Sequence, residues 1–163
     1  MSTAQDKKKV IELLNQGRAA ELTAIMQYMA QHYELDDADY GKLAKIMKTI
    51  GIQEMNHAEQ LAERILYLGG TPTSEPDGKV TKGQDIAAML KRDIGLETGA
   101  VEMYNASAMG CAKAGDHTSK QLFQDLLQDE EEHLGQFQNI QDHVAKLGDA
   151  YLATLVGDQG GEA

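Results

Sequence analysis

The sequence predicts an all-α protein: a bundle of four long helices with one long crossover and a short fifth helix at the C-terminus. Three observations support this. Apolar residues recur at helical spacing through four segments, at about 5–35, 38–68, 84–113 and 117–146. Gly and Pro cluster in one stretch between the second and third segments, from Gly69 to Gly83. Only two Phe and no Trp are present, which disfavours a β-sheet protein.

The four segments form two antiparallel hairpins. A helix of about 30 residues is about 45 Å long, so four such helices must lie side by side. Asp36 and Asp37 end the first segment, and we expect them to supply the N-cap of the second. The third and fourth segments meet at a tight turn over Lys113–Asp116. The connection of about 14 residues between the hairpins is long enough to run the length of the bundle.

The end of the chain divides into two parts. A short apolar piece at residues 151–156 follows Gly148 and is too short to be a stable helix alone. We therefore expect it to bury its side chains, either on its own bundle or against other subunits. The tail GDQGGEA is expected to be flexible. The sequence thus predicts one domain over residues 1–156 and a flexible tail over 157–163.

Charge and composition limit the kinds of partner. The chain has 26 acidic and 15 basic residues, a formal net charge of −11, which repels a phosphate backbone and attracts cations. We therefore expect no nucleic-acid partner. No run approaches the roughly 18 apolar residues of a membrane span, so no membrane partner is expected. Cys111 is the single cysteine, which suits a buried apolar role in a reducing compartment, and the expected location is cytoplasmic.

Two of the predicted helices carry the same pair of metal-binding side chains. Glu54 and His57 form a Glu-x-x-His pair in the second segment, and Glu130 and His133 form another in the fourth. Residues three apart lie on one helix face, so each pair presents a carboxylate and an imidazole together. If both pairs merely faced solvent, the apolar residues that recur around them at helical spacing would be exposed too. The pattern therefore favours two pairs that face the interior.

The first and third helices each offer one Glu at a matching height. Glu21 precedes Glu54 by 33 residues, and Glu97 precedes Glu130 by the same 33. The midpoint of each separation falls on a predicted turn. Because residues equally far from the turn of an antiparallel hairpin stand level, each Glu lies beside the Glu-x-x-His pair of its partner helix. Two packed hairpins would then bring four carboxylates and two imidazoles to one level.

This combination is the ligand pattern of di-iron carboxylate bundles. Carboxylate and imidazole suit iron, manganese or zinc, and four carboxylates balance two divalent cations when the imidazoles are neutral. Without metal, the clustered carboxylates would repel one another and some would hold protons. We predict two iron ions per chain, bound by Glu21, Glu54, His57, Glu97, Glu130 and His133.

Short motifs along the chain occur together in one known family. They are Glu21-Leu22 with Gln27-Tyr28, EMNHAE over Glu54–Glu59, AERILYLGGTP over Ala62–Pro72, Leu96-Glu97, DEEEH over Asp129–His133, and LGDAYL over Leu147–Leu152. With these motifs the chain resembles bacterioferritin, the haem-containing branch of the ferritin superfamily, over almost its whole length. The resemblance implies a ferritin-like bundle.

The resemblance also implies a role for each predicted ligand. Glu21 and Glu97 would be terminal ligands. Glu54 and Glu130 would bridge the two metals, and the histidine of each pair would supply one nitrogen. Tyr28, seven residues after Glu21 on the same helix face, would form a hydrogen bond to the ligand set.

A haem shared by two subunits, held by the same Met from each, is a further implication. Met55 stands at that position, although a lone Met is more often a core filler. It follows Glu54 by about 100° around the helix, so it points away from the metal-facing stripe. The group would be haem b or iron-coproporphyrin, one per two chains. The residues expected to line its pocket are Leu22, Ile25, Met26, Met29 and Ile52.

One pair of positions departs from the family pattern. Many bacterioferritins carry a His and an Asp five and one residues before the bridging Glu of the second helix, where they form an extra iron site on the inner cage surface. Thr49 and Gln53 stand there in this sequence. We therefore expect iron to pass through the dinuclear centre itself.

The expected function is iron storage and detoxification. A ferroxidase centre would oxidise two Fe(II) ions with oxygen or hydrogen peroxide, and the product would be stored as a ferric mineral in a hollow cage. The resemblance implies a cage of 24 subunits closed by the short fifth helix, with a shell of 12 subunits as the main alternative. An electron-donor protein that releases stored iron is a further expected partner.

Three alternatives stand beside this function. A peroxidase resembling rubrerythrin would use the same centre without storing iron, but such proteins usually add a Cys-rich domain that one Cys cannot build. A DNA-protecting mini-ferritin generally places its ligands between subunits, and this acidic chain lacks a basic tail. A haem-binding assembly with a purely structural metal site would not oxidise iron.

Overall fold

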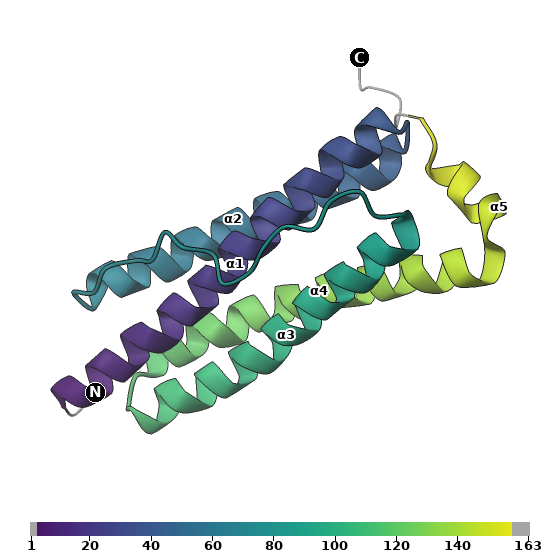
Figure 1. Cartoon of the computed structure of the whole chain (residues 1–163). Helices are drawn as coiled ribbons and strands as arrows, with labels where there is room; N and C mark the ends of the chain where they lie inside the picture. Colours follow the sequence, from purple (N-terminus) through teal and green to yellow (C-terminus); the bar gives the residue numbers. More distant parts are fainter. Residues whose placement is uncertain (1–2, 158–163) are drawn as a thin grey trace, which may run out of the picture.

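The computed structural model describes residues 3–157, and every regular secondary-structure element in that range is a helix (Figure 1). The four long helices are α1 (Ala4–Asp37), α2 (Gly41–Tyr67), α3 (Ile86–Lys113) and α4 (His117–Leu147). Two short elements follow them, α5 (Asp149–Leu152) and the 3-10 helix η1 (Ala153–Leu155). The predicted all-α bundle with a short fifth helix is confirmed. None of the helices in the described range has the length and apolarity needed to cross a membrane.

Side-chain caps begin three of the four long helices. The Thr3 hydroxyl accepts a hydrogen bond from the Asp6 N–H at the start of α1. The Asp85 carboxylate caps α3, and Asp116 caps α4 by accepting from the Ser119 N–H at 3.0 Å. The tight turn predicted before α4 therefore forms as expected.

The turn between α1 and α2 differs from the prediction. Asp36 and Asp37 belong to the last turn of α1, and α2 begins after Tyr40 without a side-chain cap. Leu35 is buried in the core, which keeps α1 helical past the predicted break. Asp39 takes a φ of 63°, a left-handed conformation that Asp tolerates better than most residues. The expectation that Asp36 or Asp37 caps α2 is therefore wrong.

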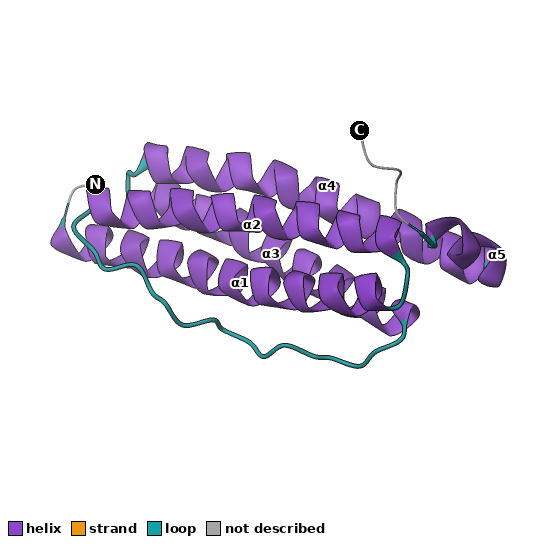
Figure 2. Cartoon of the chain, turned by 90° about the horizontal axis from the view of Figure 1, so that it is seen from above, coloured by secondary structure: helices purple, strands orange, loops and turns teal. Residues whose placement is uncertain are grey.

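The long crossover joins α2 to α3 and runs along α1 for most of the bundle length (Figure 2). Polar side chains of α1 hold it there. Asn15 accepts from the Thr73 N–H at 2.7 Å, and the Gln27 amide both donates to the Thr81 carbonyl and accepts from its N–H, each at 2.8 Å. These bonds satisfy the polar backbone of a segment that has no secondary structure of its own.

The apolar core forms two clusters at different heights in the bundle. One contains Tyr28, Met47, Leu90 and Phe137, and the other contains Leu14, Leu61, Tyr104 and Phe123. Each fully buried side chain of this size contributes about 1.5–3 kcal/mol to folding. Between the two clusters, the bundle interior is charged.

The C-terminal piece folds back on its own bundle. Leu155 is buried against the first core cluster, while Val156 stays largely exposed. Lys42 donates to the Thr154 carbonyl at 2.8 Å, and the Gly157 N–H donates to the Asp39 carbonyl. In Figure 1, α5 turns from the end of α4 towards the α1–α2 connection. Residues 158–163 of the predicted flexible tail lie outside the described residues.

Candidate metal centre

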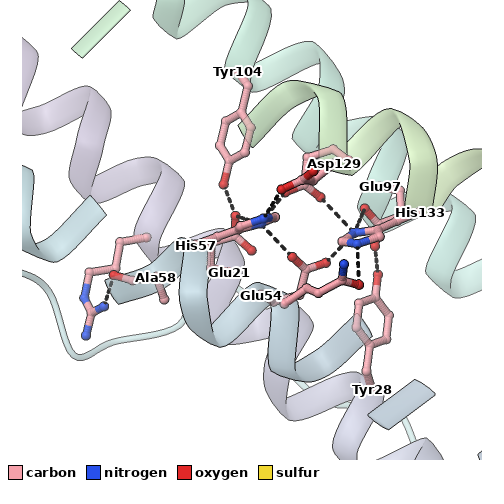
Figure 3. Close-up of polar contacts among 12 residues, drawn as sticks. Glu21, Tyr28, Glu54, His57, Ala58, Glu97, Tyr104, Asp129 and His133 are labelled. Carbon is pink, nitrogen blue, oxygen red and sulfur yellow. Dashed lines mark hydrogen bonds and ion pairs between the residues drawn. The ribbon is translucent and has the colours of Figure 1, made fainter. Parts of the chain in front are cut away.

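Six acidic and imidazole side chains from all four long helices converge between the two core clusters (Figure 3). Each is at most 3% exposed, although none is apolar. They are the six residues that the sequence predicts as metal ligands, namely Glu21, Glu54, His57, Glu97, Glu130 and His133. All six lie at one level of the bundle, as expected from their equal distances from the turns of the two hairpins.

The six side chains form two overlapping groups whose candidate ligand atoms lie within 4.8 Å of one another. The first group, here the His57 position, comprises Glu21, Glu54, His57 and Glu130. The second, the His133 position, comprises Glu54, Glu97, Glu130 and His133. Both groups contain Glu54 and Glu130, so these two residues are placed to serve both positions.

Each shared carboxylate directs one oxygen towards each histidine. From Glu54, Oε2 lies 2.9 Å from His57 Nδ1 and Oε1 lies 3.1 Å from His133 Nδ1. From Glu130, Oε1 lies 2.9 Å from His57 Nδ1 and Oε2 lies 3.7 Å from His133 Nδ1. This arrangement has the geometry of two carboxylates that bridge a pair of metal ions.

Several inward-facing atoms are buried without a well-oriented hydrogen bond. They include both carboxylate oxygens of Glu54, one oxygen each of Glu97 and Glu130, and Nδ1 of His57 and His133. Buried polar atoms in native proteins nearly always have partners. A set of lone pairs that point into a common space fits a metal-binding site, since an ion would satisfy all of them together.

Burial and mutual repulsion shift the pKa values of this cluster. Burial, and then the neighbouring carboxylates, raises the pKa of Glu21 and Glu97 well above the ordinary value. Burial alone would also raise the pKa of Glu130, but contacts with His133 and His57 lower it to about 2. Burial would lower the pKa of His133, yet Glu130 and Glu54 raise it to about 9, and carboxylates likewise raise the pKa of His57. In the metal-free protein, protons held by these glutamates and histidines therefore offset part of the negative charge of the carboxylate cluster.

Two tyrosines form hydrogen bonds to Glu21 and Glu97, the two glutamates that belong to one ion position each and are called the outer glutamates below. Tyr28 on α1 donates a hydrogen bond to Glu97 on α3, as predicted for a residue in contact with the ligand set. Tyr104 on α3 donates a hydrogen bond to Glu21 on α1, so each of these two helices supplies a tyrosine to the glutamate of the other. The contact of Tyr104 was not predicted from the sequence. Its signal was available, because Tyr104 follows Glu97 by seven residues, as Tyr28 follows Glu21.

The outer nitrogen of each histidine also has a partner. His57 Nε2 lies 3.0 Å from an Asp129 carboxylate oxygen, and His133 Nε2 lies 3.1 Å from the Gln53 amide oxygen. Neither contact was predicted. The available signal was position, since Asp129 and Gln53 each come directly before a Glu of the cluster.

A cavity of about 160 Å³ reaches the cluster between α1 and α3. Glu21, Glu97 and both tyrosines lie in its wall. Small residues, among them Gly95 and Gly99 on α3, line the same cavity and leave room beside the carboxylates. The outer glutamates are therefore within reach of a small ion that enters on this side.

Comparison with known proteins identifies the family. Residues 11–147 match the ferritin family, described as a ferritin-like domain. The chain is 48% identical to the bacterioferritin of Desulfovibrio desulfuricans over 151 residues, which cover 93% of this chain and 84% of that protein. It is 37% identical to the Brucella melitensis bacterioferritin, over 90% of this chain and 91% of that protein. This chain belongs to the ferritin family, in its bacterioferritin branch.

Solved bacterioferritin structures share the fold closely. An X-ray structure of the Desulfovibrio desulfuricans bacterioferritin, which describes its diiron site in different catalytic states, superposes with a TM-score of 0.94 at 45% identity. It covers 98% of this chain and 93% of that one. Mycobacterium tuberculosis bacterioferritin BfrA gives a TM-score of 0.89 at 30% identity, with 96% and 98% covered. The predicted resemblance to bacterioferritin is confirmed, and the rubrerythrin-like alternative is not favoured.

The residues expected to hold the bacterioferritin haem lie away from the metal centre. Met55 is 53% exposed, Ile52 is 46% exposed and Met26 is 43% exposed. Leu22, Ile25 and Met29 are partly buried. An exposed thioether on an apolar helix face fits a group that a second subunit would cover.

The two positions that depart from the bacterioferritin pattern have different surroundings. Thr49 is exposed on α2. Gln53 is partly buried, and its amide oxygen faces His133. Gln53 therefore contacts the buried cluster itself, a contact that was not predicted from the sequence.

Proposed function

We propose that this chain binds two Fe(II) ions in the buried cluster, oxidises them, and stores the product as a ferric mineral inside a cage of assembled subunits. The observation that carries the proposal is the placement of Glu54 and Glu130, each with one oxygen towards either histidine. Four carboxylates balance the charge of two divalent ions when both imidazoles are neutral. Two ions held side by side deliver two electrons together to oxygen or hydrogen peroxide.

The surrounding residues orient the ligands. Glu21 and Glu97 would each bind one ion as terminal ligands, and the hydrogen bonds from Tyr104 and Tyr28 fix their carboxylates. The cavity between α1 and α3 gives Fe(II) a path to these two glutamates. The net charge of −11 raises the local concentration of Fe(II) near the protein.

Mineral formation distinguishes storage from the rubrerythrin-like reaction, in which the same centre would reduce peroxide without retaining iron. The test adds Fe(II) in large excess under air, followed by gel filtration with iron analysis. Storage predicts that far more than two irons per chain elute with the assembled protein. Elution of only the ions that fill the dinuclear centres would contradict it.

We also propose that Met55 supplies the axial sulfur ligand to a haem b or iron-coproporphyrin shared by two chains. The support is the exposed thioether of Met55 on α2, together with two further exposed apolar side chains of the same hairpin, Ile52 on α2 and Met26 on α1. The substitution Met55→Leu conserves volume and is expected to leave the fold intact while removing the porphyrin. Absorbance of the purified protein, scaled to protein concentration, gives the stoichiometry.

Met109→Leu is the matched control for this substitution, because Met109 is similarly exposed but lies on α3. The parent and Met109→Leu should each carry one porphyrin per two chains. A porphyrin spectrum that is unchanged in Met55→Leu would rule out the thioether ligand.

A cage of 24 subunits is the proposed assembly, with 12 subunits as the alternative. Support comes from the exposed apolar side chains, which include Leu66, Tyr67 and Met109, and from the short α5–η1 piece at the end of the bundle. Truncation after Leu147 removes this piece. We expect the truncated chain to sediment as dimers or smaller shells that still bind metal at the intrachain centre but store little mineral.

Sedimentation velocity at micromolar concentration measures both proteins directly. The full chain should sediment as a single large species, and a monomer or simple dimer would contradict the cage and with it storage.

The lone, buried Cys111 supports a reducing, cytoplasmic location. Release of stored iron from a closed cage would need an electron-donor protein.

A further inference from the structure

The two candidate ion positions are built from equivalent parts. The residues of one position lie 76 residues from their counterparts in the other, as Glu21 does from Glu97 and His57 does from His133. Each position has one terminal Glu held by a tyrosine of the opposite hairpin, one histidine, and a half share of both bridging carboxylates. Ions at the two positions would therefore be bound by the same types of side chain, three carboxylates and one imidazole each.

The partners of the outer histidine nitrogens break this equivalence. Gln53 and Asp129 are also 76 residues apart, and each reaches across to the histidine of the other hairpin. His57 Nε2 meets a carboxylate oxygen at 3.0 Å, whereas His133 Nε2 meets an amide oxygen at 3.1 Å. The structure thus places different chemical groups at one pair of equivalent sites.

This difference acts on the metal-binding nitrogen. Each histidine turns Nδ1 towards the cluster, so a neutral ligand imidazole carries its proton on Nε2 and donates it outwards. A carboxylate accepts that proton in a charge-assisted hydrogen bond, which is roughly twice as strong as a neutral one and makes Nδ1 a better electron donor. An amide is uncharged, and rotation of its side chain presents an N–H donor instead, so it fixes the tautomer less firmly.

The magnitude follows from such outer contacts in other metal sites. Removing a hydrogen-bonding partner of a ligating histidine typically weakens metal binding by about 10–100-fold. The Asp129 side chain is 48% exposed, so solvent screens part of its charge and the lower end of this range applies. A difference of about tenfold between the two positions is expected.

We propose that Asp129 and Gln53 make the two ion positions inequivalent, with the His57 position the tighter one. Asp129 is then a positioning residue that acts through His57. The ion at the His133 position is then the more weakly held of the two. This inference rests on the dinuclear function proposed above.

The test locates a limiting amount of Co(II) in crystals of the assembled protein by anomalous scattering. Co(II) suits the same ligands and resists oxidation by air. With less than one Co(II) per chain, the parent should show higher occupancy at the His57 position. The double variant Gln53→Asp with Asp129→Gln exchanges the two outer groups and should reverse the order. Asp129→Gln alone should bring the two occupancies close together.

Thr49→Asp is the control for charge without contact, because Thr49 is exposed on α2 one turn before Gln53. It should leave the order unchanged. Stepwise Co(II) affinities measured by absorbance in solution should show the same pattern, with a tenfold loss at the tighter step in Asp129→Gln.

Equal occupancy in the parent, or an unchanged order in the double variant, would overturn the inference and leave the dinuclear function standing. A shift with Thr49→Asp as large as with the double variant would overturn the role of the hydrogen bond. Absence of Co(II) from both positions at saturating concentration would instead refute the proposed function. Asp93, which is buried and accepts a hydrogen bond from Gln31 at 2.9 Å, is unchanged in every variant, so its charge cannot produce the reversal.

Discussion

Replacement of Glu54 or Glu130 by Ala is expected to abolish the fast phase of Fe(II) oxidation. Each substitution removes a carboxylate that faces both histidines, so both ions lose a ligand and the pair loses a bridge. The metal ions contribute several kcal/mol to such a reaction, so the rate should fall by roughly 100-fold or more. Stopped-flow absorbance after mixing anaerobic, Fe(II)-loaded protein with oxygen measures this rate.

Exposed glutamates on the same helices supply the matched controls. Glu59→Ala on α2 and Glu131→Ala on α4 remove the same group from exposed positions, two residues after His57 and one residue after Glu130. Both should oxidise iron at the parent rate. Circular dichroism of each metal-free variant checks that the fold is retained. Should the Glu54 and Glu130 variants keep the parent rate, the dinuclear assignment is wrong.

The second large effect is the thermal stabilisation of the metal-free protein by a redox-inert ion such as Zn(II). Metal binding replaces mutual repulsion among four buried carboxylates with coordination. Two ions, each at about 100 times its Kd, stabilise the folded state by about 5 kcal/mol. For a chain of this size, that free energy corresponds to a rise in Tm of roughly 10–20 °C.

The stabilisation by Zn(II) should grow as pH rises from 6.5 to 9. His133 has a folded-state pKa of about 9, so its stabilising contribution in the metal-free protein is complete below 6.5 and disappears through this interval. The raised pKa values of Glu21 and Glu97 act in the same direction, because ionising these buried carboxyls costs folding free energy as pH rises. Glu130 loses its contribution only as pH falls towards 2.

Differential scanning calorimetry at fixed protein concentration, with and without Zn(II), provides the comparison. The variant that lacks both bridges, Glu54→Ala with Glu130→Ala, should lose most of the Zn(II) effect. An equal rise in Tm in this variant would show that the ions bind elsewhere.

The fold and the inner ligands could be predicted because both depend on position along the chain. Helical periodicity gives the face on which Glu54 and His57 lie, and equal distances from a turn give the height of Glu21 beside them. Neither inference requires knowledge of how the two hairpins meet. The structure brings all six predicted ligands together, although no distance between them could be predicted from the sequence.

Contacts between the hairpins were harder to predict. Tyr104 holds Glu21, and Asp129 reaches His57, only because α1 lies against α3 and α2 against α4. Periodicity along one helix does not fix its rotation against a helix of the other hairpin. The start of α2 was missed for a similar reason, since burial of Leu35 outweighs the turn preference of the acidic pair that follows it.

The stoichiometry of the fast oxidation phase tests the dinuclear centre most directly. Anaerobic protein is loaded with increasing Fe(II), mixed with oxygen, and the amplitude of the fast phase is plotted against iron per chain. The two overlapping ligand groups predict a linear rise that breaks at two Fe(II) per chain, with slower oxidation beyond it. A break at one Fe(II) per chain, or a rise without a break, would contradict an intrachain centre that oxidises two ions together.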